Sequence, residues 1–171
     1  MYKFFLPDEY VKDVFEITPE KLKEKGIKGI ITDLDNTLVE WDRPEATPEI
    51  IAWLKGMHDA GILVTIVSNN NGLRVMKFCE PIGTPFICDA RKPMGKSFKK
   101  ALVTMNIRKG EAVVIGDQLM TDILGGNRKG IHTILVVPVA RSDGFFTKFN
   151  RMMERRIMAR MKKLGMIHWE D

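Results

Sequence analysis

Short apolar runs alternate with segments of helical spacing along most of the chain, and this alternation limits the folds that are open to it. Five such runs lie at residues 29–32, 62–68, 85–88, 111–117 and 131–138. Most of their positions are apolar, which is typical of strands that are buried on both faces of a parallel sheet. Strands that alternate with helices predict an α/β fold, a three-layer Rossmann-like sandwich with a mainly parallel sheet.

The segment between the first two runs has clear helix signals at both ends. Thr47 and Pro48 suit the N-cap and the first helical position, and Gly61 suits the end of the helix. Similar patterns fit residues 19–25, 72–79, 96–105 and 121–129. The chain has 171 residues and contains neither an internal repeat nor a low-complexity linker, so we predict a single domain over residues 1–171.

Composition excludes several classes of protein. Hydrophobic residues make up 44% of the chain and charged residues 29%, which is a globular and not a disordered profile. The sequence has neither an apolar run of membrane-spanning length nor a signal-peptide pattern at its start, so we expect a cytoplasmic protein. Cys79 and Cys88 lack the spacing of a disulfide framework or a zinc site and are expected to be buried thiols.

Polar residues stand where three of the predicted strands end. Asp33 and Asp35 follow the first strand, Ser68 ends the second, and Asp117 ends the fourth. Ligands of a parallel sheet bind at the carboxyl ends of its strands, so these side chains are expected to meet at one edge. Any single one of them could equally be a turn residue, because Asp, Asn and Ser favour turns. Together they predict a functional site.

The acidic residues of this site suggest a particular chemistry. Two carboxylates held close together repel, so one of them keeps a proton or the pair binds a divalent cation. Carboxylates and backbone carbonyls are the oxygen ligands that Mg²⁺ prefers. Asp33 and Asp117 could meet such an ion from neighbouring strands, which leaves Asp35 free for proton transfer. A carboxylate can also act as a nucleophile and take up a phosphoryl group, whose charge a cation and a lysine would offset.

Four motifs in this order resemble those of the haloacid dehalogenase-like (HAD) phosphohydrolase superfamily. They are "DLDNTL", Ser68 in "VTIVSNN", "KPMGKSFKKAL" and "GDQLMTD". The wider chain, including "ARKPMGK" and "FTKFNRMMERR", resembles the YqeG-like subfamily of HAD class III phosphatases. The resemblance implies a HAD-like fold and a phosphatase that forms an aspartyl-phosphate intermediate.

The resemblance also implies catalytic roles for individual residues. Asp33 matches the nucleophile, and Asp35 matches the general acid and base. Family ATPases carry a threonine at the second of these positions, so Asp35 favours a phosphatase. Ser68 would donate a hydrogen bond to the phosphoryl oxygens, and Lys92 would steady the charged nucleophile and the phosphate.

The metal and phosphate sites follow from the same resemblance. Asp33, the backbone carbonyl of Asp35, and Asp117 would hold Mg²⁺, with Asp122 in support. Thr37 and Asn69 are assigned to phosphate binding.

Two other functions compete with a phosphatase. "ARKPMGKS", residues 90–97, satisfies a relaxed P-loop pattern and would make the protein a nucleotide-binding ATPase or GTPase. A phosphate-cradling loop needs free N–H groups and several glycines, whereas Pro93 removes one N–H and Gly95 is the only glycine. We therefore expect Lys96 to lie on the solvated face of a helix. The third alternative is an inactive scaffold or RNA-binding module, against which the intact set of acids, serine and lysine argues.

Spacing and family resemblance together suggest a substrate. Segments 34–67 and 69–91 are both shorter than the roughly 50 residues that a separate domain takes, so we predict a capless, open site. Capless members of the superfamily often act on large or surface-bound phosphoesters. The resemblance to the YqeG-like group suggests phosphatidylglycerophosphate, an anionic phospholipid.

The C-terminal segment is strongly basic. Residues 141–163 contain eight bases and two acids, and residues 145–165 are predicted to form an amphipathic helix. Its apolar stripe is predicted at Phe149, Met153, Ile157, Met161 and Leu164. This helix could pack its stripe on the sheet, or it could rest on an anionic membrane as a peripheral contact. A protein or RNA partner is a lesser alternative, and nucleic acid is not the expected partner.

Overall fold

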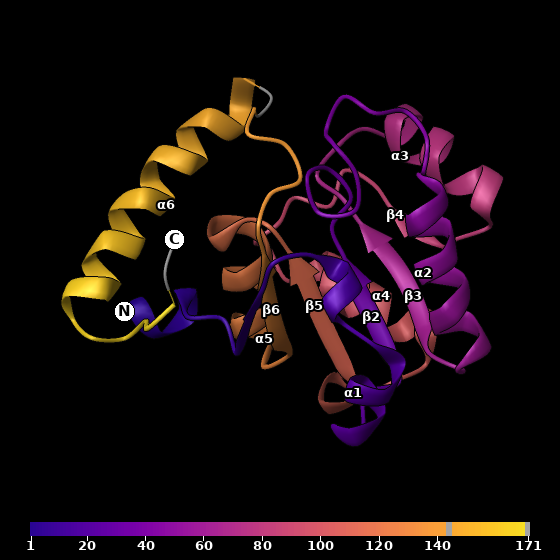
Figure 1. The fold of residues 1–171 in the computed structure, drawn as a ribbon, viewed down its shortest axis with the longest axis horizontal. Coiled ribbons are helices and arrows are strands. Elements are labelled where there is room, and N and C mark those ends of the chain that lie inside the picture. The colour runs from indigo at the N-terminus through magenta and orange to yellow at the C-terminus, as the bar shows by residue number, and fades with distance from the viewer. Residues whose placement is uncertain (143–144, 170–171) are drawn as a thin grey trace.

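Six parallel strands form one sheet in the computed structural model, which describes residues 1–142 and 145–169 (Figure 1). The spatial order is β1-β6-β5-β2-β3-β4, and every neighbouring pair is parallel. The strands are β1 (Glu9–Val11), β2 (Gly29–Thr32), β3 (Leu63–Val67), β4 (Phe86–Ile87), β5 (Ala112–Gly116) and β6 (His132–Val136). The predicted α/β sandwich with a mainly parallel sheet is confirmed.

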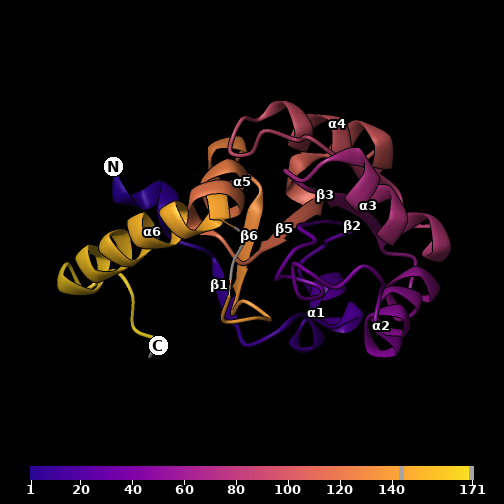
Figure 2. The same cartoon turned by 90° about the horizontal axis from the view of Figure 1, so that it is seen from above.

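Helices cover both faces of the sheet and make the three layers visible in Figure 2. They are α1 (Pro19–Glu24), α2 (Pro48–Asp59), α3 (Gly72–Cys79), α4 (Lys96–Met105), α5 (Leu124–Lys129) and α6 (Phe145–Lys163). Successive residues of a strand point to opposite faces, so Ile30 packs in one core cluster with α2 and α3, and Ile31 packs in another with α4. The predicted N-cap of α2 is present, because the Thr47 hydroxyl accepts the Ile50 N–H.

Two local features differ from the sequence prediction. Strand β1 was not predicted, because its three residues are only half-buried and too few to show a period. It extends the sheet at one edge, where Glu9 pairs with Ile134 of β6. The helix predicted over 121–129 begins instead as a π-helical turn at Leu119–Ile123 and continues as α5. A π turn carries one extra residue per hydrogen-bonded ring, and it is often found at functional sites.

Helix α6 lies beyond the β1 edge of the sheet, beside the N-terminal segment (Figures 1 and 2). Met161 is fully buried there in a cluster with Leu119, Ile123 and Leu135. The predicted stripe is only partly buried, because Phe149 and Leu164 are exposed. Ile157 and Met158 pack beside Met161, and the buried Glu154 lies in the turn before them.

Two smaller points bear on the predicted class of protein. Within the described residues, no helix combines the length and the apolar character that crossing a bilayer requires. Both cysteines are free thiols, Cys79 buried and Cys88 half-buried, and burial raises the pKa of Cys79 to about 12.

Candidate active site

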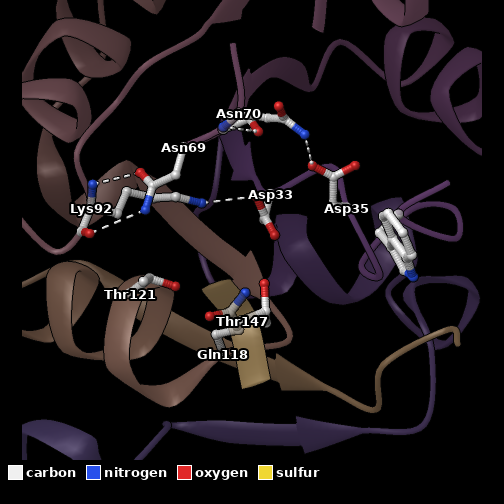
Figure 3. Close-up of a pocket in the computed structure, with 10 residues that line it drawn as sticks. Asp33, Asp35, Asn69, Asn70, Lys92, Gln118, Thr121 and Thr147 are labelled. Atoms are coloured by element: carbon white, nitrogen blue, oxygen red, sulfur yellow. Dashed lines mark hydrogen bonds and ion pairs between the residues drawn. The ribbon is translucent and has the colours of Figure 1, made fainter. Parts of the chain in front are cut away.

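The carboxyl ends of three adjacent strands bring the predicted site residues together. Asp33 follows β2, Ser68 follows β3, and Asp117 follows β5, and these strands are neighbours in the sheet. Asp33 and Ser68 line a cavity of about 360 Å³, together with Asp35, Lys92 and the residue after Asp117, Gln118. In Figure 3, Asp33 lies between Lys92 on one side and Asp35 on the other.

Three buried carboxylates lie close together at this edge of the sheet. Each of Asp33, Asp117 and Asp122 offers an oxygen, and these oxygens all lie within 4.8 Å of one another. The ammonium group of Lys92 donates to Asp33 Oδ1 at 2.9 Å and to Asp122 Oδ1 at 2.6 Å. Burial alone would lower the pKa of Lys92, but the carboxylates of Asp122 and Asp33 outweigh it and raise that pKa. Lys92 is therefore a permanent cation at this position.

The positive charge of Lys92 does not fully balance the three carboxylates. Burial raises the pKa of Asp122 to about 6, and the attraction of Lys92 offsets this only in part. Burial and the nearby charge of Asp33 raise the pKa of Asp117 well above its usual range. Such a cluster gains from a bound cation, and its all-oxygen donors at these mutual distances fit Mg²⁺.

A glycine allows Asp122 to reach the cluster. A Cβ atom added at Gly116 would lie 2.2 Å from the carboxyl carbon of Asp122, a distance at which the two groups clash. The Asp122 carboxylate also accepts the Gln118 N–H at 3.3 Å, within the π-helical region. The "GD" of the motif therefore combines one buried carboxylate, that of Asp117, with the space that a second carboxylate needs.

Asp117 also contacts helix α6. Arg151 donates to the Asp117 carbonyl oxygen at 2.8 Å, forms an ion pair with its carboxylate, and pairs with Glu154 Oε2 at 3.1 Å. In the sequence Arg151 is one of the eight bases of residues 141–163, and its contact with Asp117 was not predicted. One signal was available, because Glu154 is one of only two acids in the basic segment and stands three residues after Arg151.

Asp35 has a separate environment. Asn70 donates to its Oδ2 at 3.0 Å, and Arg74 donates to its Oδ1 from Nε at 3.2 Å and from Nη2 at 3.1 Å. Burial raises the pKa of Asp35, Asn70 and Arg74 act against that rise, and the charge of Asp33 adds to it. The two aspartates of the DxD motif thus differ in their partners. The roles of Asn70 and Arg74 as partners of Asp35 were not predicted from the sequence, although both residues follow shortly after Ser68.

The predicted phosphate-binding residues have defined partners. The Thr37 hydroxyl donates to Asp117 Oδ1 at 3.0 Å, which places Thr37 beside the carboxylate cluster. The Asn69 amide accepts the Lys92 N–H at 2.6 Å and donates to the Lys92 carbonyl at 3.2 Å, as Figure 3 shows. Ser68 is buried, and its Oγ accepts the Asn70 N–H at 3.1 Å. Asn69 therefore orients Lys92, and the contacts of Thr37 and Asn69 with phosphate stay predictions.

The P-loop alternative fits these positions poorly. Lys92 points into the carboxylate cluster, whereas Lys96, the lysine that a P-loop would use, is exposed on α4. Gly95 is not open to a phosphate either, since the Lys129 side chain fills the position where its Cβ would stand.

Comparisons with known proteins agree with this geometry. The profile of the HAD-hydrolase-like family matches residues 89–138. The chain is 66% identical to the "Probable phosphatase YqeG" of Bacillus subtilis, over 99% of this chain and 98% of that protein. It is 29% identical to the "Phosphatidylglycerophosphate phosphatase 1, chloroplastic/mitochondrial" of Arabidopsis thaliana, over 96% of this chain and 50% of that protein.

A solved structure supports the fold. The cobalt-bound deoxy-D-mannose-octulosonate 8-phosphate phosphatase of Haemophilus influenzae superposes with a TM-score of 0.56 at 16% identity, over 80% of this chain and 90% of that one. At this identity the likeness concerns the fold alone. The full-length match to the Bacillus subtilis protein shows the family, and the chain belongs to the YqeG-like phosphatases of the HAD superfamily.

Proposed function

We propose that this phosphatase hydrolyses phosphate monoesters in two steps, with Asp33 as the nucleophile. The observation that carries the proposal is the placement of Asp33 beside Lys92 at the cavity, with Asp35 held apart by its own partners. In the first step Asp33 attacks phosphorus and the ester P–O bond breaks, while Asp35 gives its proton to the leaving oxygen. In the second step Asp35 takes a proton from water, the water oxygen bonds to phosphorus, and the bond to Asp33 breaks.

Mg²⁺ is the proposed cofactor. Asp33, Asp117 and the backbone carbonyl of Asp35 would hold it, with Asp122 in support. When bound, the ion supplies positive charge that offsets the repulsion between the phosphoryl oxygens and the carboxylates. Lys92 supplies further positive charge, because its ammonium group contacts both Asp33 and Asp122.

We infer that the substrate is phosphatidylglycerophosphate. The Arabidopsis thaliana relative is named for that activity, and 96% of this chain aligns with half of that protein. The elements between Asp33 and Lys92, all of them described, are strands and the helices that cover the sheet. This segment therefore adds no separate domain over the cavity, which supports a substrate phosphate that lies on a membrane surface.

Helix α6 is the proposed membrane contact. Its exposed bases are Lys148, Arg155, Arg156, Arg160, Lys162 and Lys163. The exposed side chains of Phe149 and Met152 on the same helix, and of Leu164 directly after it, add apolar area. Each base contributes about 1 kcal/mol near an anionic bilayer, so the contact is reversible and sensitive to salt. Arg151 is left out of this set because it is bound to Asp117. We therefore place the protein in the cytoplasm, with peripheral contact at the inner face of the membrane.

An activity survey tests the chemistry. The purified protein with Mg²⁺ is assayed against phosphatidylglycerophosphate in liposomes, nucleoside phosphates, phosphopeptides and ATP. Asp33→Asn is expected to abolish phosphate release while the fold persists, since the change is nearly isosteric. Asp35→Asn is expected to slow both steps. Near-normal turnover by Asp33→Asn, or phosphate trapped on Asp35, would refute the assignment.

A vesicle assay tests the membrane contact. The protein is expected to co-sediment with phosphatidylglycerol vesicles at low salt and to stay in solution with neutral phosphatidylcholine. Changing Arg155, Arg156, Lys162 and Lys163 together to Gln is expected to weaken binding and to slow lipid turnover in vesicles. Turnover of a small soluble phosphoester serves as the control. If the variant keeps full vesicle binding, the contact lies elsewhere.

A further inference from the structure

A second cavity adjoins the active site on the side of Asp35. Its volume is about 310 Å³, and Trp41, Leu73, Arg74 and Lys77 line it. Trp41 lines the catalytic cavity as well, so the two spaces share a wall. Arg74 connects them, because it lines the second cavity and its guanidinium donates to Asp35, the proposed general acid and base. A substrate phosphate at Asp33 would therefore have this space next to it.

The lining of the second cavity combines positive charge with apolar surface. Lys77 is exposed, and it forms no ion pair with any residue in 1–142 or 145–169. Leu73, one turn earlier on α3, has 75% of its surface exposed, and the Trp41 side chain is also accessible. Asp42 is the acid in the lining, and Arg74 is ion-paired with Asp35, so Lys77 is the base of the lining whose charge is available to a bound anion. An anionic group attached to an apolar body matches this combination.

Arg74 is held in place without a ligand. Besides its two bonds to Asp35, it donates from Nη1 to the Pro44 carbonyl at 3.2 Å, and its guanidinium carbon lies 5.8 Å from the centre of the Phe78 ring. A guanidinium fixed in this way presents a charge of constant position. Lys77 adds a mobile ammonium group, which can adjust to a bound oxyanion.

We propose that this second cavity is a binding subsite for a phosphodiester that the substrate carries beside its monoester. The inference rests on the proposed function, since phosphatidylglycerophosphate has such a diester one glycerol away from the phosphate that is removed. Lys77 and the second N–H groups of Arg74 Nη1 and Nη2 bind the diester oxygens. Trp41 and Leu73 contact the carbon chain beyond the diester. The subsite makes the enzyme selective for monoesters with a second anion over simple phosphate monoesters.

Two soluble substrates test the subsite without any contribution from membrane docking. One is the deacylated head group, glycerophosphoglycerol phosphate, which has both phosphates, and the other is glycerol 3-phosphate, which lacks the diester. The wild type is expected to prefer the head group by about tenfold in kcat/KM, mainly through KM. Lys77→Gln is expected to reduce that preference several-fold, whereas Lys99→Gln, on the exposed face of α4, keeps the wild-type ratio. An unchanged ratio in Lys77→Gln would overturn the proposal.

A binding measurement separates this proposal from the proposed function. Asp33→Asn is expected to bind the head group without turning it over, and calorimetry compares it with the double variant Asp33→Asn, Lys77→Gln. Weaker binding by the double variant supports the subsite even if the wild type proves inactive on the lipid. Equal binding by both overturns the subsite, and it leaves the phosphatase chemistry unaffected.

Discussion

Removing the charge of Arg151 is expected to destabilise the folded protein and to make its stability depend on Mg²⁺. Arg151 is the cation that α6 places between two buried carboxylates, Asp117 and Glu154. Arg151→Gln keeps most of the side-chain volume and removes the charge. Both acids then lose a partner that water does not replace, because their side chains are 0% and 7% exposed.

The size of the effect follows from this burial. Removing one partner of a buried ion pair costs about 3 to 5 kcal/mol. Burial already raises the pKa values of Asp117 and Glu154, so both can take up a proton instead of remaining charged, which favours the lower figure. A loss of about 3 kcal/mol corresponds to a melting temperature lower by about 6 to 12 °C for a chain of this size.

Thermal unfolding with and without Mg²⁺ measures both parts of the prediction. A cation at Asp117 supplies the charge that Arg151→Gln removes. The loss of unfolding free energy is therefore expected to be smaller in saturating Mg²⁺ than in EDTA. Arg156→Gln is the matched control, because Arg156 is exposed on the same helix. A loss below about 1 kcal/mol, or an equal loss in both buffers, would refute the argument that Asp117 serves the helix and the metal together.

Three further predictions concern the carboxylate cluster. Gly116→Ala is expected to displace Asp122 from Lys92 and to lower kcat by about 100-fold, a loss that Mg²⁺ titration should not recover. Lys92→Ala is expected to lose about 100-fold or more in activity while Lys96→Ala has a mild effect, and the reverse order would favour a P-loop protein. Without Mg²⁺, the melting temperature is expected to fall as the pH rises from about pH 4 to pH 7. The reason is that the pKa of Asp122 rises from 3.8 to about 6 on folding, so the folded state binds more protons in that window. Mg²⁺ should stabilise more at the higher pH, and a stability that rises with pH in EDTA would contradict this reasoning.

Residues that belong to a strand end or a local motif were predictable from the sequence. The five core strands are mostly apolar, so their positions and their parallel arrangement follow from local pattern. Asp33, Ser68 and Asp117 then meet because parallel neighbours end at one edge. Lys92 depended on the resemblance to a family, since no period or cap signal separates it from the lysines that follow it.

Residues that act through tertiary contacts were not predictable. Arg74 and Arg151 reach the site from helices whose docking depends on packing far from the motifs. In the sequence they look like ordinary surface bases, and their burial follows only from the position of the whole helix. Strand β1 shows the same limit, because a half-buried edge strand of three residues forms only when its partner β6 is present.

The pairing of β1 with β6 has a consequence for synthesis on the ribosome. Asp8 and Thr133, which are bonded at this edge, are 125 residues apart in the chain. The first strand therefore leaves the ribosome long before its partner, and pairings this distant in sequence form late. Asp33 is synthesised early, but Asp117 and Arg151 emerge only with the last part of the chain. A growing polypeptide thus carries Asp33, the proposed nucleophile, for most of its synthesis without the buried carboxylate of Asp117 and the cation that pairs with it.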